Sequence, residues 1–259
     1  MDLVVFQLPW NSVLSGMALA VRTGAFVATA PIAGSESVPA QLRIGFAVLL
    51  ALLLAPIAPA PGANAAILPL VAGELFAGLL IGFAARMVVD LALFAGELGS
   101  HSSGLAIASM LDPVTQQTTP TLGVFYRLLG ALAYLAIGGH RQMIGALAKS
   151  YEIVPCGTVH LTGPWLPAAV SVTGRMLVLG VRLAAPVLAA AMLVDLFLML
   201  IARAVPQMNI LVVGAPLRYL VALLGLAFSL HMLAPIVAEA LDGATGDAFG
   251  LLRAVAGQR

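Results

Sequence analysis

The chain has 259 residues, of which 61% are hydrophobic and 9% are charged, and its formal net charge is +1. A soluble domain carries roughly 25% charged residues, so this composition excludes a surface solvated on all sides and indicates an integral membrane protein. The low net charge and the lack of a Lys/Arg cluster exclude an electrostatic footprint for nucleic acid, and a single cysteine, Cys156, excludes an internal disulfide.

The elements predicted along the chain are helices. Asp2 stands where a secretory signal would carry Lys or Arg, so no cleaved signal peptide is expected. Apolar runs follow, separated by Gly, Pro and polar clusters, and they cover residues 12–33, 44–60, 65–111, 121–148, 165–202 and 208–238. Transmembrane β-strands need only about 10 residues and alternate in polarity. The sequence therefore predicts an all-α integral membrane protein of helical hairpins with long kinked helices, undivided by any linker.

Two of these runs are too long for a simple membrane span. A helix over residues 165–202 would be about 57 Å long, whereas the hydrocarbon core of a bilayer is about 30 Å thick. Pro186 could kink or divide this helix, but the run 65–111 has no proline between Pro69 and Pro113. An undivided helix must leave the bilayer and find protein around it.

Charged residues lie inside the apolar runs, where each would cost about 2.5–3.5 kcal/mol at a bilayer centre. About half of them are expected near helix ends, from which the side chain reaches the interface. The others need partner helices or an aqueous lumen, so the chain is not expected to face lipid on all sides. These residues are Arg22, Glu74, Arg86, Asp90, Glu97, Arg127, Arg175, Arg182 and Asp195.

Small residues recur at helical spacing in the run 65–111. Gly78 and Gly82 form a Gly-x-x-x-Gly step, and Gly73 precedes them by about one turn. Such spacing lets two helix backbones approach closely. We interpret the three glycines as helix-packing positions, and a place in the wall of a lumen is the alternative.

No pattern for covalent chemistry is found. The stretch GSHSSG at 99–104 resembles an intramembrane serine-protease nucleophile only loosely, because His101 stands where the first Gly of Gly-x-Ser-Gly should be. Metal-ligand spacings and a P-loop are absent, so no enzyme, metal or cofactor is expected. A small-solute secondary transporter is the alternative class, with Asp195, Glu97 and Arg182 as coupling or substrate charges, although no internal duplication supports it.

Three stretches carry a resemblance to a known family: GSHSSGLAIASMLDPVTQQTTPTLG, IGGHRQMIGALAKSYEIVP and APVLAAAMLVDLFLMLIARAVPQMNILVVGAPLR. They resemble the FliR/SctT family of bacterial type III export-gate proteins, over the length of the chain. The tripeptide Gly-Gly-His at 138–140 resembles the flagellar members of this family more than the members that belong to injectisomes. The third stretch is the most specific, and its matching residues are Asp195, Arg203, Pro206, Gln207, Asn209, Gly214, Pro216 and Arg218. The family often has Lys at the last of these positions, which keeps the charge.

The resemblance implies a structural subunit of the flagellar type III protein-export gate, multi-pass in the bacterial inner membrane at the flagellar basal body. Its implied partners are FliP- and FliQ-like gate subunits, an FlhB-like protein and membrane lipid, with unfolded flagellar proteins as transient substrates. Long hairpins in such gates pack around a channel, and much of the assembly rises out of the bilayer plane. The implied division is a FliP-like N-terminal part, 1–160, and a FliQ-like C-terminal hairpin and tail, 161–259.

The resemblance also implies a function for the polar stretch in the middle of the chain. In the family, the segment before an Asp-Pro step is a plug loop inserted into the channel. Large apolar side chains in such a loop exclude water and ions, and Met repacks easily around an irregular gap. A plain helix end followed by a capped loop is the alternative. The implied plug residues are Gly104, Leu105, Ala106, Ile107, Ala108, Ser109, Met110, Leu111, Asp112 and Pro113.

The residues from Arg203 to Arg218 are predicted to form a turn between two long helices. Pro206 and Pro216 are expected to break helices, and Arg203, Gln207 and Asn209 supply polar side chains. We further predict that this turn contacts neighbouring gate subunits or the FlhB-like protein.

Overall fold

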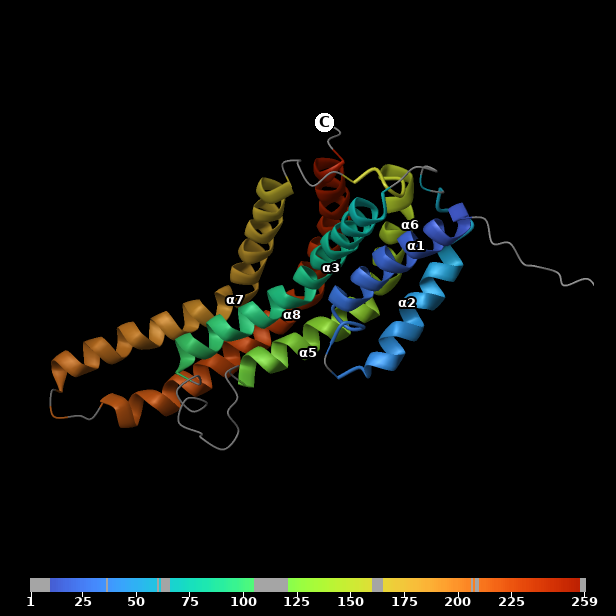
Figure 1. Ribbon diagram of the computed structural model, residues 1–259. Helices are drawn as coiled ribbons and strands as arrows, with labels where there is room; N and C mark the ends of the chain where they lie inside the picture. Colours follow the sequence, from blue (N-terminus) through green and yellow to red (C-terminus); the bar gives the residue numbers. More distant parts are fainter. Residues whose placement is uncertain are drawn as a thin grey trace, which may run out of the picture. The chain divides into compact units, whose positions relative to one another are not determined.

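The computed structural model describes residues 10–35, 37–59, 61, 66–104, 121–159, 165–205, 207 and 210–256. Within these ranges all regular structure is helical, which confirms the all-α prediction (Figure 1). The helices are α1 (Trp10–Thr29), α2 (Ala40–Leu54), α3 (Ile67–Ser103), α5 (Thr121–Ala136), α6 (Gly139–Ile153), α7 (Trp165–Ala204) and α8 (Ile210–Val255).

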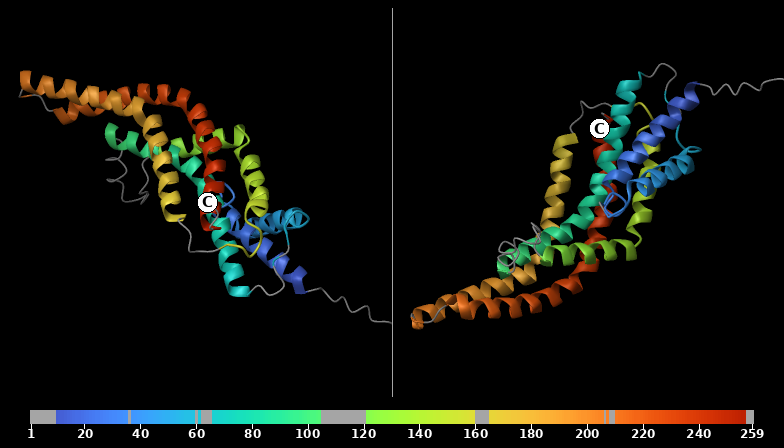
Figure 2. Two further views of the ribbon diagram at one scale, coloured as in Figure 1. Left: turned by 90° about the horizontal axis from the view of Figure 1, so that it is seen from above. Right: turned by 60° about the horizontal axis from the view of Figure 1, so that its bottom comes forward.

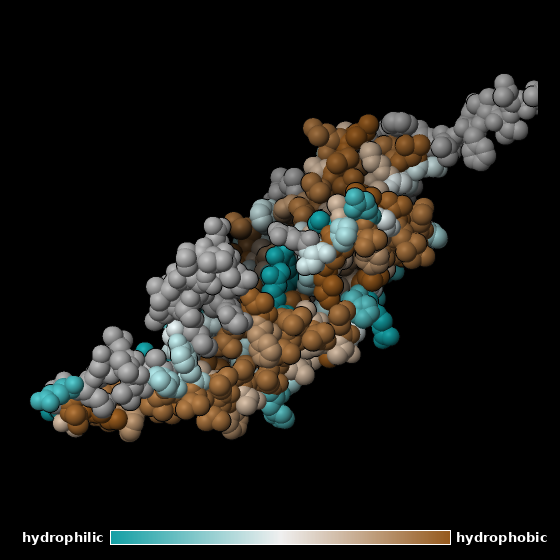
Figure 3. All heavy atoms as spheres, turned by 90° about the horizontal axis from the view of Figure 1, so that it is seen from below, coloured by the Kyte–Doolittle hydropathy of each residue, from teal (hydrophilic) through white to brown (hydrophobic). Residues whose placement is uncertain are grey.

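Four stretches in the described part of the chain are long and apolar enough to cross a membrane. They are Ser12–Thr29, Ile67–Ser103, Trp165–Ala204 and Pro216–Val255, and a fifth results if α5 and α6 form one broken span. The face drawn in Figure 3 is mostly apolar, with polar residues scattered over it. The chain is therefore an all-α integral membrane protein.

The chain forms two compact units. Unit 1 comprises Met1–Met87, Gly138–Val172 and Asp242–Arg259, and unit 2 comprises Val88–Ile137 and Thr173–Leu241. The units interleave in sequence because α3, α7 and α8 each contribute residues to both. Each unit is therefore built from segments that are far apart in the chain.

Unit 1 has an apolar core made by three of these segments. Leu80 of α3 packs with Val172 of α7 and with Leu251 and Val255 of α8, and all four side chains are buried. At the rim of this cluster, the rings of Phe76 and Trp165 meet edge to face with their centroids 5.0 Å apart. Aromatic pairs favour this arrangement because the positive edge of one ring meets the negative face of the other.

Unit 2 contains a hairpin in which α7 and α8 run side by side (Figure 2). The helices approach closely at Gly225, where an added Cβ would lie 2.8 Å from the Cα of Val187. In the same unit α3 packs against α5, since a Cβ added at Gly96 would lie 2.6 Å from the carbonyl oxygen of Leu122. Small residues thus set the closest helix contacts of this unit.

Prolines do not divide the two longest helices. Pro186 lies inside the 40-residue α7, and Pro216 and Pro235 lie inside the 46-residue α8. The prediction that Pro216 breaks a helix is therefore wrong. A proline removes one backbone hydrogen bond, but ending the helix in apolar surroundings would leave further N–H and C=O groups unsatisfied. At 1.5 Å per residue α7 is about 60 Å long and α8 about 69 Å.

The predicted run 121–148 contains a break instead of one helix. α5 ends at Ala136 and α6 begins at Gly139. Gly138 between them has φ of 77°, a left-handed conformation that glycine adopts without steric cost. Its carbonyl accepts the N–H of Arg141 at 3.0 Å and so begins α6.

Candidate functional site

The predicted plug begins where the described part of α3 ends. Gly104 follows the last residue of α3 with φ of 75°, and its N–H donates to the carbonyl of His101 at 3.3 Å. The remaining plug residues, Leu105 to Pro113, lie outside the described residues. The plug therefore stays a prediction from the family resemblance.

The serines before the plug bond to their own helix. The hydroxyls of Ser100, Ser102 and Ser103 each donate to the carbonyl four residues earlier, at 2.8, 2.9 and 2.8 Å. Such bonds satisfy a hydroxyl inside an apolar helix without a partner from elsewhere. The last turns of α3 thus use these hydroxyls in local backbone contacts.

The residues predicted to contact partners lie around the α7–α8 turn. Arg203, in the last turn of α7, and Gln207 are both exposed. Gly214 is buried, and a Cβ added there would lie 2.8 Å from Cδ1 of Leu198. Pro216 is exposed within α8. Pro206 and Asn209 lie outside the described residues.

The two charged ends of the third sequence stretch meet across the hairpin. Nη2 of Arg218 lies 2.6 Å from Oδ1 of Asp195, and Nε of Arg218 donates to the same oxygen at 2.8 Å. The side chains remain 33% and 48% exposed. Two residues of the third sequence stretch thus form a contact between α7 and α8.

A second ion pair joins the same two helices further along. Nη1 of Arg182 donates to both carboxylate oxygens of Glu239, at 3.0 and 3.2 Å. Both side chains are more than half exposed. The hairpin therefore carries one exposed ion pair and one partly buried ion pair between α7 and α8. Arg182 and Asp195 are two of the three charges named above for the alternative of a solute transporter. In the structure each of them forms an ion pair within the hairpin.

A hydroxyl closes the hairpin near Pro186. Ser229 of α8 is buried, and its hydroxyl donates to the carbonyl of Leu183 in α7 at 2.7 Å. Gly225, one turn earlier in α8, brings its backbone against Pro186 and Val187. Two residues of α8 thus pack directly on the proline-containing turn of α7.

Unit 1 contains a fully buried ion pair at the centre of a polar network. Nε of Arg22 in α1 donates to Oε2 of Glu74 in α3 at 2.6 Å, and neither side chain has any exposed area. Nη1 and Nη2 of Arg22 donate to the hydroxyl of Ser150 at 3.1 Å and to the carbonyl of Val154 at 3.0 Å. The guanidinium carbon also lies 4.3 Å from the ring centroid of Tyr151. One guanidinium therefore holds α1, α3 and the end of α6 together.

Glu74 extends the network to the loop after α6. Its Oε1 accepts the backbone N–H of Gly157 at 3.0 Å, and Gly157 has a left-handed φ of 82°. The pKa of the neighbouring Cys156 thiol is raised to about 11, mainly by burial and also by the charge of Glu74, while Arg22 lowers it. The loop after α6 is thus fixed by a carboxylate from α3.

The three predicted helix-packing glycines face other parts of unit 1. A Cβ at Gly78 would meet the carbonyl of Arg22, and one at Gly82 would meet the hydroxyl of Thr29, so α3 approaches the backbone of α1 at both. A Cβ at Gly73 would lie 2.8 Å from Cβ of Val159. Gly78 thus brings α1 and α3 together beside the Arg22–Glu74 pair.

Sequence reasoning marked Arg22, Glu74, Asp195 and Arg182 as charges inside apolar runs without saying which of them have partner helices. In the structure each of the four has an ion-pair partner on another helix. Sequence reasoning did not identify the partners, since pairs separated by 23 to 57 residues leave no periodic signal. It also missed Ser229 and Glu239. In the described residues no group of three or more His, Cys, Asp or Glu could hold a metal ion.

Comparison with known proteins gives the family. The chain is 32% identical over 220 residues to the flagellar biosynthetic protein FliR of Caulobacter vibrioides, covering 83% of this chain and 88% of that protein. It is 29% identical over 223 residues to FliR of Bacillus subtilis, covering 84% and 86%. The surface presentation of antigens protein SpaR of Salmonella typhimurium is 27% identical over 164 residues, covering 63% and 62%. The family described as bacterial export proteins, family 1, matches residues 13–244, and this chain belongs to it.

Proposed function

We propose that the chain is a structural subunit of the flagellar type III protein-export gate in the bacterial inner membrane. The family match over residues 13–244 carries the proposal, and relatives named as flagellar biosynthetic proteins support the flagellar system. The subunit helps to form and close a channel for unfolded flagellar proteins and catalyses no covalent reaction. Two of the relatives compared above are named as flagellar biosynthetic proteins and the third as a surface presentation of antigens protein, so none of these names favours the solute carrier.

The surface of the α7–α8 hairpin supports assembly with other subunits. At about 60 Å, α7 is twice as long as a hydrocarbon core is thick, yet large apolar side chains are exposed along it and along α8. Lipid cannot cover such a length, so FliP- and FliQ-like subunits are proposed to cover the remainder. The large apolar side chains of α7 and α8 that are more than 60% exposed are Val170, Val178, Met192, Leu193, Met199, Leu200, Leu220, Leu224 and Phe228.

The proposed division of the chain follows the same hairpin. Residues 161–259, which hold α7 and α8, are the FliQ-like part, and residues 1–160 are the FliP-like part. The support is that the second part holds two consecutive long helices, α7 and α8, which run side by side in unit 2 (Figure 2). An FlhB-like protein is the further proposed partner.

The first experiment is affinity purification of the chain at native expression in mild detergent, followed by identification of the co-purifying proteins. We expect FliP- and FliQ-like subunits in a defined complex. A chain that purifies alone and monodisperse, from cells that contain those subunits, would contradict the proposal.

The plug proposal has its own test. Deletion of Gly104 to Leu111 is expected to make the assembled gate leak small ions, because the apolar side chains that exclude water would be lost. The measurement is membrane conductance in cells whose gate still assembles. The control replaces Gln116 and Gln117, which follow the plug, with Ala. Unchanged conductance in the deletion variant would rule the plug out.

The turn after α7 is proposed to contact a neighbouring subunit or the FlhB-like protein through Arg203 and Gln207, both of which are exposed. Replacement of both with Ala should reduce co-purification. The matched control replaces Arg141 and Gln142, an exposed pair on α6, with Ala. Wild-type assembly and secretion in the first double variant would refute a partner role.

A further inference from the structure

A weak point of α7 and a weak point of α8 lie in contact within unit 2. Pro186, inside α7, has no N–H to donate to the carbonyl of Arg182, so one backbone hydrogen bond of the helix is missing there. Gly225, inside α8, lowers the stability of that helix. A Cβ added at Gly225 would lie 3.1 Å from the carbonyl oxygen of Pro186 and 2.8 Å from the Cα of Val187. The two backbones therefore touch where each helix bends easily.

One ion pair between the helices lies on each side of this contact. The Arg182–Glu239 pair joins α7 and α8 on one side, and the Asp195–Arg218 pair joins them on the other side. The part of the hairpin that contains the second pair is thus tied together beyond the contact and can move as one piece. This part, called the outer hairpin below, comprises residues 187–204 of α7 and 210–228 of α8.

A hydrogen bond between the two helices lies directly at the contact. The buried hydroxyl of Ser229 donates to the carbonyl of Leu183 at 2.7 Å. Leu183 lies three residues before Pro186, in the turn that the proline disturbs. In membrane proteins, serine side chains and neighbouring helices satisfy backbone groups that a proline frees. This bond therefore fixes α8 to the turn of α7 that bends most easily.

Both partners of this bond have alternative partners in their own helices. The serines near the end of α3 donate to the carbonyl four residues earlier, and the equivalent carbonyl for Ser229 is that of Gly225. The carbonyl of Leu183 can in turn accept the N–H of Val187, four residues later. The bond between the helices can thus open without leaving a buried polar group unpaired, which would be costly.

We propose that the contact of Pro186 with Gly225 is a joint at which the outer hairpin bends, and that the bond from Ser229 to Leu183 is the latch that holds the arrangement of the structure. Sharp bends in helices occur at prolines, and a hinge absorbs a movement at a few residues while the parts on each side stay rigid. The inference concerns a movement within this chain, so it goes beyond the proposed export function and does not depend on it.

The test is the distance between two spin labels, measured by pulsed electron paramagnetic resonance in the full chain as purified with any subunits that accompany it. Cys156 is first replaced by Ala, so that only introduced cysteines carry labels. Val178 and Leu200, both exposed, lie on opposite sides of the joint and would be about 33 Å apart in a straight helix. We expect one main distance and a minor second distance, whose share increases up to roughly tenfold in Ser229→Ala because one hydrogen bond is lost.

Two controls separate a joint from a general loosening of the protein. Ser100→Ala removes a buried hydroxyl that bonds within its own helix, and it should leave the distances as they are. Leu200 and Leu224 are exposed positions that both lie in the outer hairpin. The distance between labels at these two positions should keep one value in every variant.

A second variant acts on the proline and keeps the latch. Pro186→Ala restores the missing backbone N–H and should make the hydrogen bonding of α7 continuous. The distribution of the Val178–Leu200 distance should then narrow to one value, also in combination with Ser229→Ala. This variant gives a result even where Ser229→Ala does not fold.

Three outcomes would overturn the proposal. The first is the same Val178–Leu200 distribution in Ser229→Ala as in the protein that keeps Ser229. The second is a distribution in Pro186→Ala that is as broad as before. The third is a change of the Leu200–Leu224 distance in Ser229→Ala, which would mean that α7 and α8 separate instead of bending together.

Discussion

Arg22 and Glu74 pair at 2.6 Å with both side chains fully buried, although 52 residues separate them in the chain. Removal of one partner leaves the other charge buried and uncompensated, which costs about 3–5 kcal/mol. Glu74→Gln, which keeps the size of the side chain, should lower the free energy of unfolding by about that amount. The measurement is denaturant unfolding of the purified chain in detergent.

The exposed Arg182–Glu239 pair gives the matched control for Glu74→Gln. Glu239→Gln removes the same charge from a pair whose side chains are 52% and 54% exposed. Exposed pairs contribute about 0–1 kcal/mol, so this variant should unfold almost as the wild type does. Equal losses in the two variants would show that burial of the Arg22–Glu74 pair does not set its contribution.

Exchange of the two charges of the Asp195–Arg218 pair is expected to restore the stability that each single substitution removes. Asp195→Arg and Arg218→Asp should each weaken the hairpin because they place like charges side by side. The double variant should recover, with a coupling of up to about 1 kcal/mol, since the pair is only partly buried. Unfolding of the four proteins in detergent measures this coupling. A double variant no more stable than the less stable single variant would mean that the contact does not join α7 to α8.

Replacement of glycine by alanine is expected to raise stability at Gly145 and to lower it at Gly78. Gly145→Ala in α6 meets nothing within 4 Å, and removal of a helix-interior glycine gains about 0.5–1 kcal/mol. Gly78→Ala brings a Cβ against the carbonyl of Arg22 and the Cβ of Ala25, and overpacking costs about 1–3 kcal/mol. The melting temperature should therefore rise in Gly145→Ala and fall in Gly78→Ala. A rise in both would show that α1 can move away from Gly78 freely.

We expect the reactivity of the Cys156 thiol to depend on pH because its pKa is raised. Its pKa is raised by burial from 9.0 to about 11, and only the thiolate reacts with iodoacetamide. At pH 8 the folded protein should therefore react roughly a hundredfold more slowly than the unfolded chain. Its rate should continue to rise above pH 9, and a plateau there would contradict the raised pKa.

The same shift has a consequence for stability. A raised pKa means that the folded state holds its proton more tightly than the unfolded state. The contribution of the neutral thiol to stability is therefore complete below pH 9 and is lost as the pH rises toward 11. Cys156→Ala should remove this part of the pH dependence.

Much of the fold could be predicted from the sequence because membrane burial makes helices long and apolar. The run 165–202 coincides with α7 almost to the residue. The prediction failed at Pro216, where local propensity favours a break but the apolar surroundings favour a continuous helix. It also stopped α8 at 238, whereas the helix continues to Val255 through a less apolar segment.

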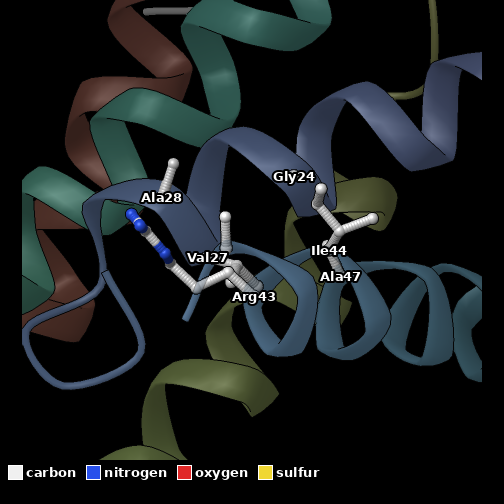
Figure 4. A pocket seen from close by; sticks show the side chains of 7 residues that line it. Gly24, Val27, Ala28, Arg43, Ile44 and Ala47 are labelled. Carbon is white, nitrogen blue, oxygen red and sulfur yellow. The ribbon is translucent and has the colours of Figure 1, made fainter. Parts of the chain in front are cut away.

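The candidate site could be predicted only as separate residues. Arg22 and Glu74 are visible as charges in apolar runs, but their pairing depends on the packing of α1 against α3 at Gly78. Asp195 was visible as a charge in an apolar run, Arg218 came from the family resemblance, and the contact between them came from the structure. The pocket between α1 and α2 (Figure 4) was not predicted from the sequence, because its lining residues come from two separate helices.

The hydrogen bond from Ser229 to the carbonyl of Leu183 has a consequence for biosynthesis. Ser229 lies 46 residues after Leu183, so the ribosome makes α7 completely before it adds the hydroxyl that bonds there. The carbonyl of Leu183 therefore has no such partner until the following helix, α8, has been translated as far as Ser229. The bond can form only when α8 packs against the finished α7.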